Sequence, residues 1–141
     1  MVVDSSALLA ILRKEPEAAR FTRAILRDSV RLISAANLLE AGIVIDNQAG
    51  PSAGRRLDAF VERARIAVEP VTEEQVRIAR QAYLDFGRGN HSAKLNFGDC
   101  FAYALSKATG EPLLFKGHDF EQTDIQACRP ASSGPQAAAP P

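Results

Sequence analysis

Four acidic residues stand where helices or strands are expected to begin or end, or on a helix face: Asp4, Glu40, Asp99 and Asp119. In open α/β sheets, ligand sites form outside the carboxyl ends of the strands, where we expect Asp4 and Asp119. If all four acids converge, their repulsion raises their pKa values unless a divalent cation neutralises them. A pocket of carboxylates suits Mg²⁺ or Mn²⁺, ions that polarise phosphodiesters and activate a bound water. The pattern therefore favours phosphoryl-transfer chemistry.

Each of these acids also has a purely structural explanation. Asp4 and Asp99 are suited to capping a helix N-terminus, and Asp119 is suited to a turn. Glu40 could be a solvated helix residue, but it lies in the apolar segment 38–43. An unpaired carboxylate buried there would cost several kcal/mol, so we expect a cation beside it.

The elements that must position these acids alternate between strand and helix. Short apolar runs typical of strands occupy 1–3, 30–34, 66–68 and 112–115. Helical patterns cover 7–12, 19–27, 35–48, 52–65, 73–87 and 100–108. In the third of these helices, Leu39 and Ile43 are expected to face inward. The alternation predicts a mostly parallel sheet covered by helices on both faces.

Composition limits the class of protein. The chain has 141 residues, of which 46% are hydrophobic and 24% are charged, as in an ordinary globular domain. Seventeen basic residues balance seventeen acidic ones, so any contact with nucleic acid must be local. The chain has no signal peptide pattern and no apolar run of about 20 residues, so we expect a cytoplasmic protein without membrane contact. We expect one folded domain at 1–128 and a disordered, Pro/Ala-rich tail at 129–141.

Four segments carry a more specific signal because of their order along the chain. They are DSSAL at 4–8, SAANLLEA at 34–41, LNFGDCFAYAL at 95–105 and LFKGHDF at 114–120. Together these segments resemble the motifs of PIN-domain ribonucleases and, more narrowly, of the VapC toxins of bacterial toxin–antitoxin pairs. The resemblance extends from Met1 to about Cys128, which is the whole chain except the tail.

The resemblance implies a fold, an activity and partners. The fold is a three-layer α/β/α domain with a mostly parallel central sheet. Its metal pocket, matched position by position, is formed by Asp4, Glu40, Asp99 and Asp119. The activity is that of an endoribonuclease that uses Mg²⁺ or Mn²⁺ and a metal-activated water to hydrolyse RNA. The partners are a second copy of the chain and a VapB-like antitoxin that blocks the pocket.

Further residues receive supporting roles by the same resemblance or by their position. Ser6 matches a hydroxyl that orients water or phosphate, and Asn96 supports the pocket from outside the ligand set. Lys94 and Lys116 lie beside the acidic motifs and are candidates for RNA contact. A stripe of arginines at 20–27 suits either phosphate contact or a solvated helix face.

Two other functions stay open on the sequence alone. A catalytically silent PIN-like domain that binds RNA or a protein would carry the same motifs. A receiver-type phosphoacceptor domain also places acids on a parallel sheet, and Lys116 could serve there. However, the strand at 66–68 is followed by Glu69 and Pro70 rather than by an acceptor Asp.

Overall fold

A short apolar run forms the central strand of the sheet. The computed structural model describes residues 1–131. Within them, β1 (Val2–Val3) is fully buried and pairs in parallel with β2 (Leu32–Ser34) and with β4 (Leu113–Leu114). The edge strand β3 (Ala67–Glu69) pairs in parallel with β2, which gives the order β3-β2-β1-β4. The parallel pairing follows from the helical crossovers that the sequence predicted between strands.

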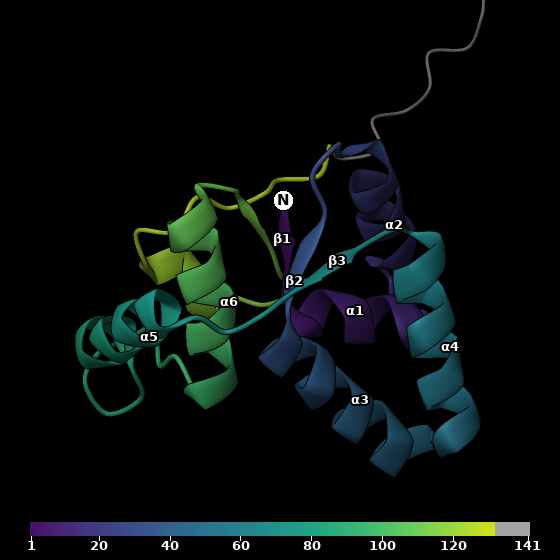
Figure 1. Ribbon diagram of the computed structural model, residues 1–141, viewed down its shortest axis with the longest axis horizontal. Helices are drawn as coiled ribbons and strands as arrows, with labels where there is room; N and C mark the ends of the chain where they lie inside the picture. The colour runs from purple at the N-terminus through teal and green to yellow at the C-terminus, as the bar shows by residue number, and fades with distance from the viewer. Residues whose placement is uncertain (132–141) are drawn as a thin grey trace, which may run out of the picture.

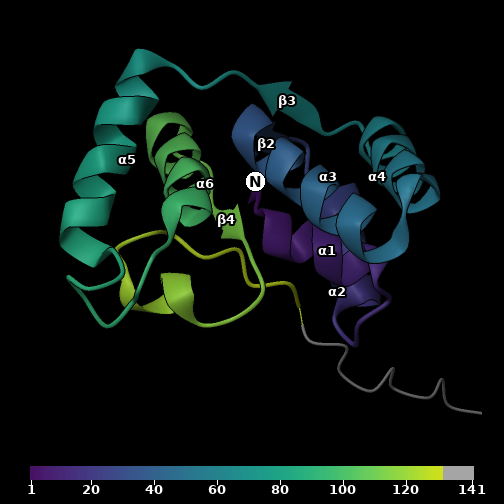
Figure 2. The ribbon, with the colours of Figure 1, turned by 90° about the horizontal axis from the view of Figure 1, so that it is seen from below.

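Helices cover both faces of this sheet (Figures 1 and 2). One side carries α1 (Ser5–Leu12), α2 (Ala18–Arg27), α3 (Ala35–Ala49) and α4 (Pro51–Arg63). The other side carries α5 (Glu73–Phe86), α6 (Phe97–Thr109) and the short 3₁₀ helix η1 (Asp119–Gln122). The result is the three-layer α/β arrangement that the sequence predicted.

Two apolar cores lie on the two faces of the sheet. Val3 and Leu114 pack in the first core with α1 to α4, whereas Val2 and Leu113 pack in the second core with α5 and α6. Both strands divide in this way because successive side chains of a strand point to opposite faces. The strands are short, so the two layers of helices supply most of the buried apolar surface.

Helix α3 turns a different face to the core than its sequence predicted. Leu39 and Ile43 were expected to face inward, but they are 64% and 53% exposed. The buried residues of α3 are instead Asn37, Ala41 and Ile45. A polar residue takes a core position here because the Asn37 amide donates a hydrogen bond to the Gly98 carbonyl, at 2.9 Å.

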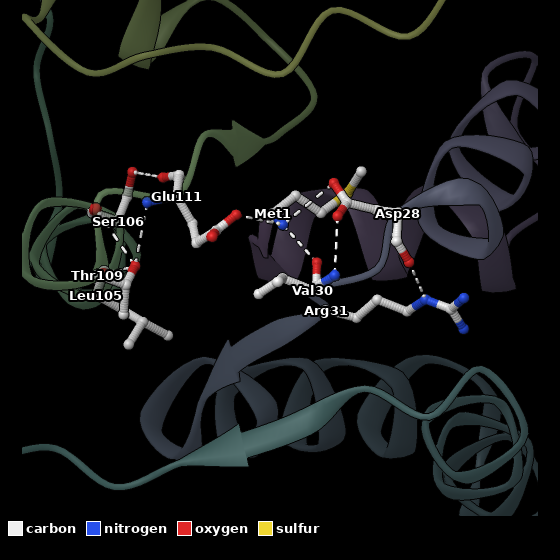
Figure 3. Close-up of polar contacts among 8 residues, drawn as sticks. All are labelled: Met1, Asp28, Val30, Arg31, Leu105, Ser106, Thr109 and Glu111. Carbon is white, nitrogen blue, oxygen red and sulfur yellow. Dashed lines mark hydrogen bonds and ion pairs between the residues drawn. The ribbon is translucent and has the colours of Figure 1, made fainter.

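Ion pairs close the amino end of the sheet (Figure 3). The Met1 ammonium lies 3.2 Å from Asp28 Oδ2 and 3.0 Å from Glu111 Oε2, and it also donates to the Val30 carbonyl. Asp28 Oδ1 accepts a hydrogen bond from the Val30 N–H at 2.9 Å. Burial alone would raise the pKa of Asp28, but the Val30 N–H and the ammonium hold it below its usual value. Both carboxylates at this end therefore share the Met1 ammonium as a cationic partner.

Two predictions concern the whole chain, but the structure describes only residues 1–131. The predicted tail at 129–141 lies outside them from residue 132 onward. In the part of the chain that is described, every helix is too short or too polar to cross a bilayer.

Candidate active site

Asp4 directly follows β1 and caps helix α1. Its Oδ2 accepts a hydrogen bond from the Ser6 N–H at 3.0 Å, as the structural explanation of this residue required. Its other oxygen, Oδ1, is buried and has no hydrogen-bond partner among the described residues. Burial raises the pKa of Asp4 to about 6, and the charge of Glu40 adds to this rise. Capping thus uses one oxygen and leaves the other for a ligand.

Glu40 brings α3 into contact with the first turn of α6. Its Oε1 accepts a hydrogen bond from the hydroxyl of Ser5, the residue after Asp4. Its carboxylate also lies against Gly98, where a Cβ atom would overlap it. One turn earlier in α3, Asn37 holds the Gly98 carbonyl. The two helices are therefore joined at the position where Glu40 approaches Asp99.

Asp99 is the third residue of α6 and forms a capping box with Asn96. The Asn96 side chain accepts a hydrogen bond from the Asp99 N–H, and Asp99 Oδ2 accepts one from the Asn96 N–H, each at 2.9 Å. The sequence placed the start of this helix at residue 100, but it begins at Phe97 because the capping box satisfies its first N–H groups. Asn96 thus positions Asp99 directly. Burial raises the pKa of Asp99 to about 7.

The four acids predicted from the sequence are electrostatic neighbours. After burial, the charges of Asp4, Asp119 and Glu40 also raise the pKa of Asp99, against the hydrogen bond from Asn96. Asp119 opens η1 beyond β4 and is exposed. Within residues 1–131, no three Asp, Glu, His or Cys side chains converge as closely as a bound metal ion requires. The acids thus gather near one end of the sheet without forming a closed set of ligands.

The other predicted site residues lie at different depths. The Ser6 hydroxyl accepts a hydrogen bond from the Lys116 backbone N–H at 3.0 Å, which ties α1 to the segment after β4. The Lys116 ammonium is paired with Glu15 and Glu17. Lys94 is exposed in the 87–95 segment, and no hydrogen bond or ion pair of the described residues links it to the acids.

The donor groups at this site fit a hard divalent cation. They are carboxylate and hydroxyl oxygens, which Mg²⁺ and Mn²⁺ prefer. Asp4 Oδ1 is a buried acceptor without a donor, and the raised pKa values of Asp4 and Asp99 indicate a site that lacks positive charge. A cation would remove both penalties.

Three residues at this site were not predicted from the sequence: Ser5, Asn37 and Gly98. Two of them left a signal that could have been used. A polar Asn37 in an apolar helix suggests a buried hydrogen bond, and a glycine in the first turn of a helix suggests a close approach of another group. Ser5 left none, since Ser6 next to it is an equally good donor.

Comparison with known proteins agrees with this architecture. A family model described as PIN domain matches residues 1–126. Ribonuclease VapC28 of Mycobacterium tuberculosis is 54% identical over 127 residues, which cover 89% of this chain and 96% of that protein. Ribonuclease VapC of Mycolicibacterium smegmatis is 49% identical over 127 residues, which cover 90% of this chain and 98% of that protein. The chain therefore belongs to the PIN-domain family and, within it, to the VapC ribonucleases.

A solved structure supports the fold independently. The crystal structure of Mycobacterium tuberculosis VapC20, described as a sarcin-ricin loop cleaving toxin, matches with a TM-score of 0.74 at 20% identity. The match covers 92% of this chain and 98% of that chain. The predicted family and the predicted α/β fold are thus confirmed, and the receiver-type alternative has no support.

Proposed function

We propose that this chain is a metal-dependent endoribonuclease and the toxin of a toxin–antitoxin pair. The observation that carries the proposal is the half-buried Asp99 carboxyl, whose pKa is raised by its burial and further by the charges of three other acids. Clustered acids of this kind cost stability, which a structural role alone would not require. The similarity to VapC ribonucleases supports RNA as the substrate.

In this proposal Asp4, Glu40, Asp99 and Asp119 hold Mg²⁺ or Mn²⁺. A bound divalent ion supplies positive charge that lowers the pKa of a water, so that the water can attack a phosphodiester as hydroxide. The same charge offsets that of the phosphate. The protein fixes the carboxylates beforehand. The α1 cap orients Asp4, the capping box orients Asp99, and the Ser5 hydroxyl orients Glu40.

Other residues act on the RNA rather than on the ion. Ser6 orients a water or a phosphate oxygen, and its bond to the Lys116 N–H holds the hydroxyl in place. Lys94 and Lys116 contact the RNA backbone from the two segments that flank the acids. Because Lys116 is already paired with Glu15 and Glu17, its contact with RNA requires an exchange of partners.

The proposal includes partners and domain limits. Residues 1–128 form the nuclease domain, and the tail from 129 is dispensable for the reaction at the acids. The protein acts in the cytoplasm with a VapB-like antitoxin as its inhibitor. We also infer a homodimer, supported by exposed apolar side chains at Leu39, Ile43 and Val68, which line one shallow surface. Light scattering on the purified protein tests this state. An Ile43→Asp variant that stays dimeric would exclude this surface.

Cleavage assays test the proposed activity. The purified chain is incubated with a labelled RNA hairpin in Mg²⁺, in Mn²⁺ or in EDTA. We expect cleavage only with a metal ion, with 5′-phosphate ends on the products, and loss of cleavage in Asp99→Asn. The matched control is Glu62→Gln, which removes an exposed acid of α4. Unchanged cleavage by Asp99→Asn, or full activity in EDTA, would exclude the proposed role of the acids.

A catalytically silent PIN domain that binds RNA or a protein is the alternative. The observation that favours it is the open arrangement of the acids. Melting temperature distinguishes the cases when it is read beside cleavage, since a ligand of the folded state raises stability by mass action. Stabilisation by Mn²⁺ together with cleavage supports the nuclease. If Mn²⁺ has no effect and the RNA stays intact, the silent domain is correct.

A further inference from the structure

Four arginines gather where α2 faces the segment that follows η1. Arg20, Arg23 and Arg27 come from α2, and Arg129 comes from the C-terminal segment. Two adjoining hollows, of about 880 and about 470 Å³, lie along this surface, and Arg20 and Arg129 line both. We call these four residues the α2 arginine track. The sequence indicated the three arginines of α2. The structure adds that Arg129, from the C-terminal segment, lies beside them.

The charge of this track is compensated only in part, since Arg20 is among the charges that lower the pKa of Glu17. None of its four guanidinium groups makes a hydrogen bond or an ion pair within residues 1–131, and Arg20 Nε is buried without a partner. The Arg20 guanidinium lies 5.6 Å from the centre of the Phe21 ring, which holds it in place. By contrast, Arg31 donates to three backbone carbonyls. The track therefore has donors available for a ligand.

The acids near the track already have partners. Glu17 pairs with Lys116, Asp28 pairs with the Met1 ammonium, and Glu121 shares a hydrogen bond with His118 Nδ1. These pairs leave the arginines as the free charges of the surface. An anion is the ligand that this chemistry accepts, and guanidinium groups suit phosphate oxygens in particular.

The larger hollow connects the track to the candidate active site. It is lined by Lys116 and His118, which precede Asp119. Lys116 also bonds to the Ser6 hydroxyl beside Asp4. The arginines of α2 extend about 10 Å further along the helix axis, at the usual rise per residue. A polyanion that passes the acids would continue directly along this surface.

Resting on the proposed nuclease function, we propose that the α2 arginine track binds the phosphate backbone of the RNA strand that leads away from the scissile bond. The chain has no net charge, so attraction of RNA needs a local patch of this kind. RNA fits better than an acidic peptide because the surface is continuous with the site at which the RNA must react. The track gives affinity without reading sequence, since it offers contacts to phosphate only.

The test compares two triple variants that remove the same number of charges. One is Arg20→Gln, Arg23→Gln and Arg27→Gln, and the control is Arg55→Gln, Arg56→Gln and Arg63→Gln on the exposed face of α4. The probe is a labelled single-stranded RNA of about 12 nucleotides, kept intact by EDTA and followed by fluorescence anisotropy at several salt concentrations. We expect about tenfold weaker binding for the α2 triple variant and a salt slope smaller by about two, since each lost phosphate contact removes about 0.7 from the slope. The control should bind within about twofold of the wild type.

Several results would overturn the proposal while leaving the nuclease function intact. One is equal RNA affinity and equal salt slope for the wild type and the α2 triple variant. Another is weaker binding of an oligo-glutamate peptide by the α2 triple variant with unchanged binding of RNA, which would make the surface a protein site.

If the triple variant does not fold, Arg23→Gln alone replaces it, because this residue is exposed. A wild type that binds RNA through the track but never cleaves it would support the track and refute the nuclease.

Discussion

Carboxylates at the two ends of the sheet have opposite surroundings. At the amino end, Asp28 and Glu111 flank the Met1 ammonium at 3.2 and 3.0 Å (Figure 3). At the carboxyl end, Asp4 and Asp99 are partly or fully buried and have other acids as their charged neighbours. The pKa of Asp28 is lowered, whereas those of Asp4 and Asp99 are raised to about 6 and about 7.

This difference separates charges that stabilise the fold from charges that lower its stability. A carboxylate whose pKa is lowered by its partners stabilises the folded state at neutral pH, and one whose pKa is raised destabilises it. The charges at one end of the sheet thus stabilise the folded state, and those at the other end destabilise it. We expect the second end to recover that stability only when a cation binds.

The largest predicted effect concerns the space beside Glu40. In Gly98→Ala the new Cβ overlaps the Glu40 carboxylate, which is the far end of a flexible side chain and can move away. We expect the fold to survive and the rate of RNA cleavage to fall on the order of 100-fold, as for a displaced charged group in an active site. Single-turnover cleavage and circular dichroism measure the two properties.

Gly42→Ala is the matched control on the helix that carries Glu40. A Cβ at residue 42 makes only an ordinary contact, 4.0 Å from Leu57. This variant should keep full activity and gain about 0.5 kcal/mol in helix stability. Equal activity of Gly98→Ala and the wild type would mean that the position of the Glu40 carboxylate does not matter for cleavage.

The next prediction compares two variants, each of which replaces one acid by Asn, at opposite ends of the sheet. Asp99→Asn should raise the free energy of unfolding on the order of 1 kcal/mol at pH 7.5 without metal, because it removes a carboxylate that is costly to ionise. Asp28→Asn should lower it by about 1 kcal/mol, because it breaks the contact with the Met1 ammonium. Urea denaturation in EDTA measures both. Changes of the same sign would refute the contrast between the two ends.

The fold of the chain was more predictable from the sequence than the contacts that position the residues of its site. The strands of the sheet and Asp4 after β1 could be placed because short apolar runs and capping residues are local signals. The inward face of α3 could not, because Asn37 enters the core through a bond to Gly98, which lies 61 residues away. Ser5 and Gly98 act on Glu40 from 35 and 58 residues away along the chain. Such contacts depend on how helices meet, which no local pattern encodes.

The two ends also predict how stability depends on pH. Asp4 and Asp99 have folded pKa values of about 6 and about 7, above the value of 3.8 for a free side chain. Their contribution to stability is fully present below pH 3.8 and is lost as the pH rises through 6 and 7. Asp28 contributes in the opposite sense, so its stabilisation is lost as the pH falls below 3.8.

The melting temperature in EDTA should therefore be higher at about pH 5 than at about pH 8. Asp99→Asn should flatten the fall at the alkaline side, because it removes one of the two titrating groups. A melting temperature that rises steadily from pH 5 to pH 8 would mean that the acid cluster does not control stability. Added Mn²⁺ should reduce the fall in the wild type, since a bound cation favours the ionised carboxylates.

The smallest predicted effect concerns the hydroxyl that orients Glu40. Ser5→Ala removes the hydrogen bond to Glu40 Oε1 and leaves the carboxylate free to rotate. We expect a loss of about 1 kcal/mol of transition-state stabilisation, or about fivefold in cleavage rate. Ser52→Ala, which changes an exposed serine in the first turn of α4, is the control and should leave the rate unchanged. A rate for Ser5→Ala equal to that of the control would show that Glu40 is held by packing alone.

The four acids lie on elements that pack in two different apolar cores. This division affects how the protein loses activity under denaturing conditions. Asp4 caps α1 and Glu40 lies in α3, both packed on one face of the sheet, whereas Asp99 and Asp119 lie in α6 and η1 on the other. Because each half carries only part of the acid cluster, a slight separation of the halves would stop catalysis while both halves keep their helices. RNA cleavage should therefore decline at lower urea concentrations than the far-ultraviolet signal, which makes enzymatic output a sensor of how tightly the two layers are joined.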